Sequence, residues 1–131
     1  MKATKYFSHN ELACKATNKV ILADGFGDRL DELRRLWDNP LYPSSACRSV
    51  IHNEAVGGAK NSFHIYNHPD RDFGTCAIDL KHIGSLASSA DRWRFVMLAM
   101  TLGWSVGIAK TFIHIDRRSD YTNDKPRIFG Y

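Results

Sequence analysis

The first strong hydrophobic pattern along the chain has helical spacing. Between Asp24 and Trp37, hydrophobic residues recur every three or four positions, and charged residues occupy many of the positions between them. This spacing predicts an amphipathic helix with one face turned to a core, and Asn39-Pro40 is expected to end it. The hydrophobic residues of this face are Phe26, Leu30, Leu33 and Trp37.

A second hydrophobic pattern with helical spacing spans residues 88–102, and a glycine follows it. It also predicts a helix. Two shorter helices are expected, one after Ser8, which has capping-box spacing to Glu11, and one over Ser49–Val56, before a pair of glycines. The residues expected on the core-facing stripe of the longer helix are Trp93, Val96, Met97 and Met100.

Short hydrophobic runs and alternating hydrophobic and polar residues predict the strands. Since successive residues of a strand point to opposite faces, His114 and Asp116 are expected on one face. Ile113 and Ile115 are then expected to point into the core. The expected strands are 41–46, 77–80, 106–108 and 111–115, the last two as a pair.

The polar stretches between these elements predict loops. Residues 65–76 are rich in turn-forming residues and predict an exposed loop, and residues 119–131 predict a surface tail. No repeat, linker or shift of composition divides the chain, so we expect one domain over residues 1–131. A content of 44% hydrophobic and 24% charged residues is typical of a folded domain.

The net charge of +4 suits an anionic partner such as a cell-wall polymer, nucleic acid or an acidic membrane surface, and does not choose among them. No compact run of basic residues interleaved with aromatics is present, so nucleic acid is not the expected partner. No run of ~20 apolar residues predicts a membrane span, and no signal peptide is recognisable, so we expect synthesis in the cytoplasm. Three cysteines without a CxxC pair predict free, buried thiols rather than a disulfide framework.

Three residues of metal-binding type stand out, namely His64, Asp79 and His114. Asp79 ends an apolar run, where burial of an unpaired carboxylate would be costly. Two histidines and an aspartate can hold one Zn²⁺ and leave a fourth position for water, which is the pattern of a catalytic zinc site. Taken singly, the same residues also fit a loop histidine, a turn cap and a hydrogen-bonded core histidine.

Longer motifs surround these residues in a fixed order. They are Arg48-Ser49-x-x-His52-Asn53-x-x-Val56-Gly57-Gly58-Ala59-x-x-Ser62-x-His64, then Ala77-Ile78-Asp79, then Phe112-Ile113-His114-Ile115-Asp116-x-Arg118. Over roughly residues 6–118 the chain resembles the zinc D-Ala-D-Ala carboxypeptidase family (peptidase family M15). It is most similar to the compact branch of phages and bacteria, which includes phage endolysins.

The resemblance implies a small α+β domain with helices packed mainly on one face of an antiparallel sheet. It implies that His64, Asp79 and His114 bind Zn²⁺. It places Arg48 near the substrate, where a guanidinium binds a carboxylate or stabilises the oxyanion of a tetrahedral intermediate. The implied substrate is bacterial peptidoglycan, cut in the stem peptide or cross-link by a D,D-carboxypeptidase or an endopeptidase.

The chain departs from the family pattern in the spacing of two ligands. The family usually has six residues between the first histidine and the aspartate, and that spacing leads from His64 to Arg71, which cannot bind a metal. We therefore expect an insertion within residues 65–76 that forms a surface loop or a wall of the substrate groove, with Asp79 as the ligand. Rival ligands within the insertion are His68, Asp70 and Asp72.

The second departure concerns the catalytic base. Many relatives have Asp or Glu three residues before the third ligand, where this chain has Thr111, which cannot act as a base at neutral pH. Asp116 is the expected substitute. Alternatively, Asp116 forms a salt bridge with Arg117 or Arg118 or a hydrogen bond behind the metal ligands. In a third arrangement Asp116 binds the metal and His114 transfers protons.

Other polar residues have lesser expected roles. Ser62 is expected to orient the site through hydrogen bonds, and His52 either contacts the substrate or lies on a helix surface. His82 is close enough to Asp79 in sequence to line the site, although a solvent-exposed histidine fits equally. Cys47 lacks the His/Asn frame that would make it a nucleophile.

Two interpretations of function follow. The first is a monomeric zinc metallopeptidase that acts on the cell wall after release from the cytoplasm. The second is a non-catalytic wall-binding or virion module with the same fold. The altered ligand spacing and the missing acid at Thr111 favour the second, whereas the retained ligand types and Arg48 favour the first.

Overall fold

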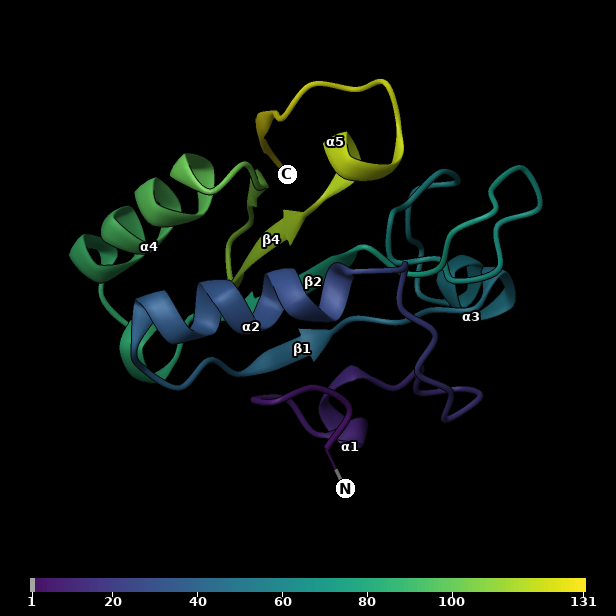
Figure 1. Ribbon diagram of the computed structural model, residues 1–131, viewed down its shortest axis with the longest axis horizontal. Helices are drawn as coiled ribbons and strands as arrows, with labels where there is room; N and C mark the ends of the chain where they lie inside the picture. Colours follow the sequence, from purple (N-terminus) through teal and green to yellow (C-terminus); the bar gives the residue numbers. More distant parts are fainter. Residues whose placement is uncertain (1) are drawn as a thin grey trace.

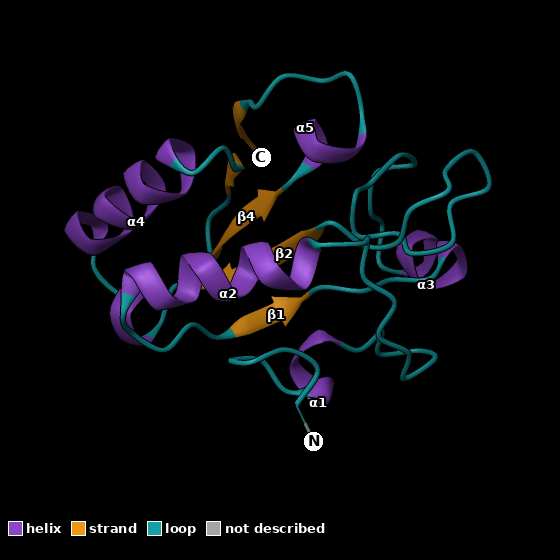
Figure 2. Ribbon diagram, viewed as in Figure 1, coloured by secondary structure: helices purple, strands orange, loops and turns teal. Residues whose placement is uncertain are grey.

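Five strands form one sheet in the computed structural model, which describes residues 2–131. The strand order is β1-β2-β4-β3-β5, and every neighbouring pair is antiparallel except β3 and β5. Figure 2 shows how much of the remaining chain is loop. The strands are β1 (Pro43–Ser45), β2 (Ala77–Lys81), β3 (Ser105–Ile108), β4 (Phe112–Asp116) and β5 (Ile128–Gly130).

The two longest helices, α2 and α4, lie over one face of this sheet (Figure 1). The described helices are α1 (His9–Leu12), α2 (Phe26–Trp37), α3 (Val50–Ala55), α4 (Ser89–Thr101) and α5 (Arg118–Tyr121), with a 3-10 turn at Gly84–Leu86. The predicted α+β class, with helices mainly on one face of a largely antiparallel sheet, is confirmed.

Local signals explain where the first helices begin. The Ser8 hydroxyl accepts the backbone N–H of Glu11, and the Glu11 carboxylate accepts the N–H of Ser8, which is the predicted capping box. Helix α2 begins at Phe26 rather than at Asp24 because Gly25 before it adopts a left-handed conformation with φ of 83°. The residues of its predicted stripe are buried or half-buried, namely Phe26, Leu30, Leu33 and Trp37.

The predicted core stripe of α4 is wrong except for Val96, which is half-buried against the core. Trp93 is 65% exposed, and Met97 and Met100 are exposed as well. The buried residues are Phe95 and Ala99, and Phe95 packs edge-on against Trp37 of α2 with 5.2 Å between the ring centroids. Both faces of α4 carry apolar residues at helical spacing, so periodicity alone does not choose between them, whereas contact with α2 does.

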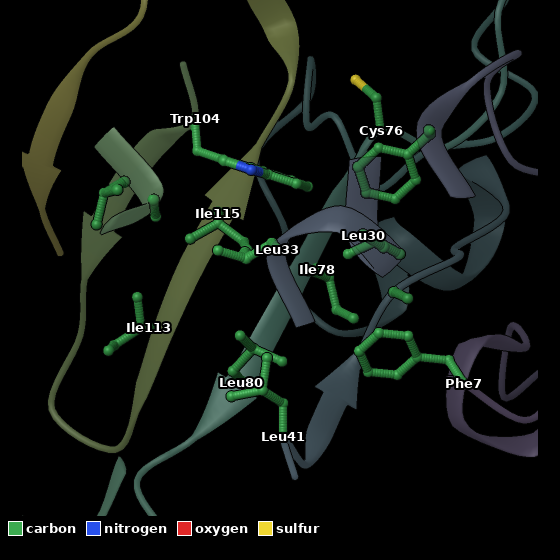
Figure 3. Close-up of a cluster of buried hydrophobic side chains, with 14 of the residues drawn as sticks. Phe7, Leu30, Leu33, Leu41, Cys76, Ile78, Leu80, Trp104, Ile113 and Ile115 are labelled. Atoms are coloured by element: carbon green, nitrogen blue, oxygen red, sulfur yellow. The ribbon is translucent and has the colours of Figure 1, made fainter. Parts of the chain in front are cut away.

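Alternation along the central strands separates a core face from an open face. Ile78 and Leu80 of β2 lie with Ile113 and Ile115 of β4 in the hydrophobic cluster beneath the helices (Figure 3). The residues between them, including Asp79, point to the other face. This sheet therefore places polar side chains on the surface that α2 and α4 do not cover.

One row of residues crosses the open face of the sheet. Asp79 of β2 pairs with His114 of β4, which pairs with Gly107 of β3, which in turn pairs with Phe129 of β5. On the other side, Ser45 of β1 pairs with Asp79. The register therefore aligns one residue from each of the five strands in a row that contains two candidate metal ligands.

The loop over residues 65–76 contains neither helix nor strand, as predicted, but it is only partly exposed. Its two ends are buried, because Ile65 forms a bridge with Arg48 and Thr75 forms a bridge with Leu22. In its middle, the Arg71 guanidinium donates hydrogen bonds to the carbonyl oxygens of residues 61 and 62. The insertion is therefore fastened to the preceding segment.

Residues 119–131 lie at the surface, as predicted, but they form regular structure rather than a tail. Helix α5 follows β4 directly, and the chain then returns as β5, parallel to β3 at the edge of the sheet. Residues 128–131 read Ile-Phe-Gly-Tyr, and Phe129 packs over Gly107. This sequence pattern is too short to predict a strand. The strand is stabilised by the packing of Phe129 into the space over Gly107 of β3.

The corrected stripe of α4 can be tested by a pair of substitutions. We expect Phe95→Ala to lower the free energy of unfolding by about 3–5 kcal/mol, because it removes a fully buried ring from the core. The matched change Trp93→Ala, on the exposed face, is expected to cost less than about 1 kcal/mol. Urea denaturation at one fixed zinc concentration measures both, and equal losses would contradict the assignment.

Candidate metal centre

Three side chains converge on the open face of the sheet. Asp79 comes from β2, His114 from β4, and His64 from the segment that follows α3. Each offers one ligand atom, these atoms lie within 4.8 Å of one another, and all three residues are buried. Within residues 2–131, no other three His, Cys, Asp or Glu side chains meet in this way.

The hydrogen bonds behind the two histidines leave one free nitrogen on each ring. His64 Nδ1 donates to the carbonyl oxygen of Ala46 at 2.7 Å, so its Nε2, 3.1 Å from Asp79 Oδ1, carries a lone pair in the neutral ring. His114 Nε2 donates to Asp116 Oδ2 at 2.8 Å, and its Nδ1 lies 3.0 Å from the same Asp79 oxygen. Two imidazole lone pairs thus face one carboxylate oxygen.

Three electron-pair donors that face one another at these distances are stabilised by a positive charge between them, which either a ring proton or a metal ion supplies. Burial lowers the pKa of His64, which favours its neutral form. Although burial opposes it, hydrogen bonds with Asp116 and Asp79 raise the pKa of His114, so positive charge is favoured where the three residues meet. Two imidazole nitrogens and a carboxylate are ligands that suit Zn²⁺, and the site fits a divalent metal ion.

Asp116 lies behind His114 and is completely buried. Its two oxygens accept the Nε2–H of His114 and three hydrogen bonds from Arg118, one from the backbone N–H and two from the guanidinium. Despite burial, the bonds from His114 and Arg118 lower the pKa of Asp116 to about 2. Asp116 therefore contacts the ring nitrogen opposite to the one that faces Asp79.

Arg48 contacts Asp79 and is itself held by two other side chains. Its Nη2 lies 3.4 Å from Asp79 Oδ2, while its Nη1 donates to Asn53 at 3.1 Å and its Nε donates to Ser45 at 3.0 Å. The approach is close: a Cβ built on Gly58 would lie 3.0 Å from Arg48 Nη1 and 2.2 Å from Asn53 Oδ1. Of the glycine pair that follows α3, Gly58 is thus needed for this packing, and Gly57, with φ of 74°, for the turn.

The candidate ligands line a cleft with a volume of about 1180 Å³. The segment after α3 and the 65–76 loop form one side, and the chain after β4 forms another. Ser62 lines this cleft, and its hydroxyl accepts the backbone N–H of His64 at 3.2 Å. His52 is half-buried on α3 and does not line the cleft, nor does His82.

The rival ligands in the 65–76 loop do not belong to the group of three convergent side chains. His68 and Asp70 line the cleft, but the Nε2 of His68 lies 3.1 Å from Asn61 Oδ1 and its Nδ1 accepts the backbone N–H of Asp70. Asp72 is exposed and does not line the cleft. The loop contributes to the cleft wall, as one of the sequence-based alternatives had it.

Aromatic residues around the cleft were missed by the sequence analysis. The Phe63 ring lies between two guanidiniums, 4.5 Å from that of Arg71 and 4.7 Å from that of Arg118. Phe129 and Tyr131 also line the cleft. The available signal was the alternation of aromatic residues at positions 129 and 131, which the polar residues before them obscured.

Comparison with known families now assigns the chain. Residues 5–116 match the sequence profile of the family described as Peptidase M15. The chain belongs to this family. As an M15 peptidase it is a metallopeptidase, and its buried His-Asp-His group is able to hold the metal. A comparison with curated proteins finds no match. Within residues 2–131, no helix is long and apolar enough to cross a membrane.

The contacts of Asp116 lead to a prediction about metal affinity. Asp116→Asn weakens the acceptor behind His114, and loss of such a supporting hydrogen bond typically costs about 10–100-fold in metal affinity. We expect a zinc affinity reduced by this factor in a competition titration with a chelator. Asp124→Asn, a change of the same kind at a more exposed cleft residue, is the control. An Asp116→Asn protein that is folded by circular dichroism and binds zinc as wild type does would refute this role.

Proposed function

We propose that this M15 peptidase is a zinc enzyme that hydrolyses an amide bond in the peptide part of bacterial peptidoglycan. The observation that carries the proposal is the convergence of two imidazole lone pairs and a carboxylate in the wall of an open cleft. A structural zinc site is closed by four protein ligands, whereas a catalytic site has three and a position for water.

His64 Nε2, His114 Nδ1 and Asp79 are the proposed zinc ligands. When bound, Zn²⁺ supplies a water of lowered pKa and polarises the scissile carbonyl. The chain itself fixes the ligands before the metal arrives, because Ala46 holds the ring of His64 and Asp116 holds the ring of His114. Arg48 holds the second oxygen of Asp79.

We assign Asp116 an orienting role rather than that of the base. All its hydrogen bonds with His114 and Arg118 are made on the far side of the His114 ring, and the side chain does not line the cleft. A general base must reach the proton that it takes within hydrogen-bonding distance. The arrangement supports the alternative in which Asp116 selects the tautomer of His114 and leaves its Nδ1 free.

Arg48 is the proposed substrate-binding cation of the site. Its side chain is 15% exposed, lines the cleft and touches Asp79, so a substrate at the metal would lie beside it. A fixed guanidinium there can bind a substrate carboxylate or the developing oxyanion. Because Asn53 and Ser45 hold two of its nitrogens, the group is positioned before substrate binds.

The nature of the cleft supports a peptidoglycan peptide as substrate. Arginines from several segments line it, and a basic surface attracts stem peptides, which carry free carboxylates. The activity is that of an endopeptidase of the endolysin kind or of a D,D-carboxypeptidase, exerted by a monomer on the cell wall after release from the cytoplasm. The lining arginines are Arg48, Arg71, Arg118 and Arg127.

One observation favours a second candidate function. Asp116 is turned away from the cleft and Thr111 replaces the usual acid, so neither residue presents a base to the metal position. A zinc-containing module that binds the cell wall without cutting it would need no base. Activity measurements separate this candidate from the enzyme.

Zymography on purified cell walls tests the proposed function. We expect a clear zone with the wild-type protein, its loss with a chelator and its return with zinc. His64→Ala removes one ligand and should abolish both stoichiometric zinc binding and clearing. Wild-type protein that contains zinc and binds walls but leaves them intact would favour the non-catalytic module, and an active His64→Ala variant would refute the ligand assignment.

Substitution of Arg48 separates its role in substrate binding from its contact with Asp79. Arg48→Lys keeps the charge but loses the planar group that reaches three partners. We expect kcat/KM to fall by roughly 10²–10³, as for loss of an electrostatic donor, while zinc content stays near one ion per chain. Metal analysis and peptide-release kinetics measure the two effects. Zinc loss equal to the activity loss would mean that Arg48 acts only through Asp79.

A further inference from the structure

We propose that β5 and the residue after it form a substrate-binding wall, in which the rings of Phe129 and Tyr131 hold the peptide against the metal centre. The inference rests on the proposed peptidase function and extends it to residues beyond the family match, which ends at residue 116. The proposed occupant is the stem peptide, with its alanine methyl groups and backbone lying on the two rings.

The register of the sheet places this wall beside the ligands. Phe129 pairs with Gly107 and Gly107 pairs with His114, so Phe129 stands in the same cross-strand row as two proposed ligands. The Phe129 ring centroid lies 5.6 Å from that of His114, and the Tyr131 centroid lies 6.3 Å from it. A peptide bound at the metal would therefore meet these rings.

A glycine in the floor of the sheet seats both rings. A Cβ built on Gly107 would lie 2.5 Å from Phe129 Cε2 and 2.9 Å from Tyr131 Cε1. The two rings stack on each other at 5.7 Å with an interplanar angle of 27°, and Phe112 packs edge-on against Tyr131. A strand residue with a side chain would occupy this space, so the absence of one at position 107 sets where the rings lie.

Arg118 fixes the wall from a second side. Its guanidinium lies 5.4 Å from the Phe129 ring and 4.7 Å from the Phe63 ring on the other side of the cleft. The same guanidinium binds both oxygens of Asp116, which holds His114. The aromatic wall is therefore attached to the group that orients one of the proposed zinc ligands.

The solvent exposure of the two rings beside the metal centre indicates a surface that can bind a ligand. Tyr131 is 70% exposed and Phe129 is half-buried, although both touch a buried centre. Aromatic side chains provide a large contact area with little loss of rotamer freedom, and the tyrosine adds a hydroxyl donor. Ile128, the residue before Phe129 in β5, is 62% exposed but does not line the cleft. It therefore serves as a control from the same strand.

The test compares alanine substitutions in β5, at the residue after it and at Gly107 of β3. The variants are Phe129→Ala, Tyr131→Ala and the control Ile128→Ala, with Gly107→Ala to displace the rings without removing them. For soluble stem peptides released from purified peptidoglycan, we expect KM to rise about tenfold in Phe129→Ala, Tyr131→Ala and Gly107→Ala, the size of one good aromatic contact. Zinc content and kcat should stay within about twofold of wild type, and Ile128→Ala should match wild type.

Binding of non-hydrolysable analogues of the same peptides to the zinc-loaded protein, measured by calorimetry, provides a readout that does not need catalysis. A wild-type KM and dissociation constant in both ring variants, or an equal effect of Ile128→Ala, would overturn the wall while leaving the peptidase intact. If wild type binds the peptides without cutting them, and the ring variants lose binding, the peptidase proposal fails and the wall stands. If wild type neither binds nor cuts them, both fail.

Discussion

The structure depends on one electrostatic constraint, which is that three electron-pair donors face one another in a buried place. Each is held from behind by a group that dictates its orientation: the Ala46 carbonyl behind His64, Asp116 behind His114 and Arg48 beside Asp79. Without a cation between them, two imidazole lone pairs and a carboxylate oxygen would repel one another at about 3 Å. The surrounding hydrogen bonds are therefore arranged around a positive charge, and in this family that charge is a metal ion.

The fold supplies the rigidity that this arrangement requires. β2 and β4 are the neighbours in the middle of the sheet, and their register fixes the separation of Asp79 and His114 without help from loops. Helices α2 and α4 bury the opposite face, which frees this face for polar groups (Figure 1). The third side chain, His64, comes from a loop segment. Backbone hydrogen bonds from Arg48 to His64 and from Tyr66 to Arg48 hold that segment beside Arg48.

Sequence reasoning succeeded where a local pattern decides the outcome. The alternation in residues 111–116 and the apolar run before Asp79 predicted the two central strands and the shared face of His114 and Asp116. It failed where tertiary contact decides: α4 has two apolar faces, and β5 is held by a glycine in a distant strand. The contacts of Asp116 were equally out of reach, because a sequence gives residue types but not which side of an imidazole ring a carboxylate occupies.

Arg118 joins parts of the molecule that are usually considered separately. Its guanidinium lies between Phe63 and Phe129 and also binds the carboxylate behind His114. From these rings, the contacts of Arg118 lead through two hydrogen-bonded steps to an imidazole in the metal centre. A single side chain therefore holds one wall of the cleft and, through one carboxylate, the ring of a candidate metal ligand.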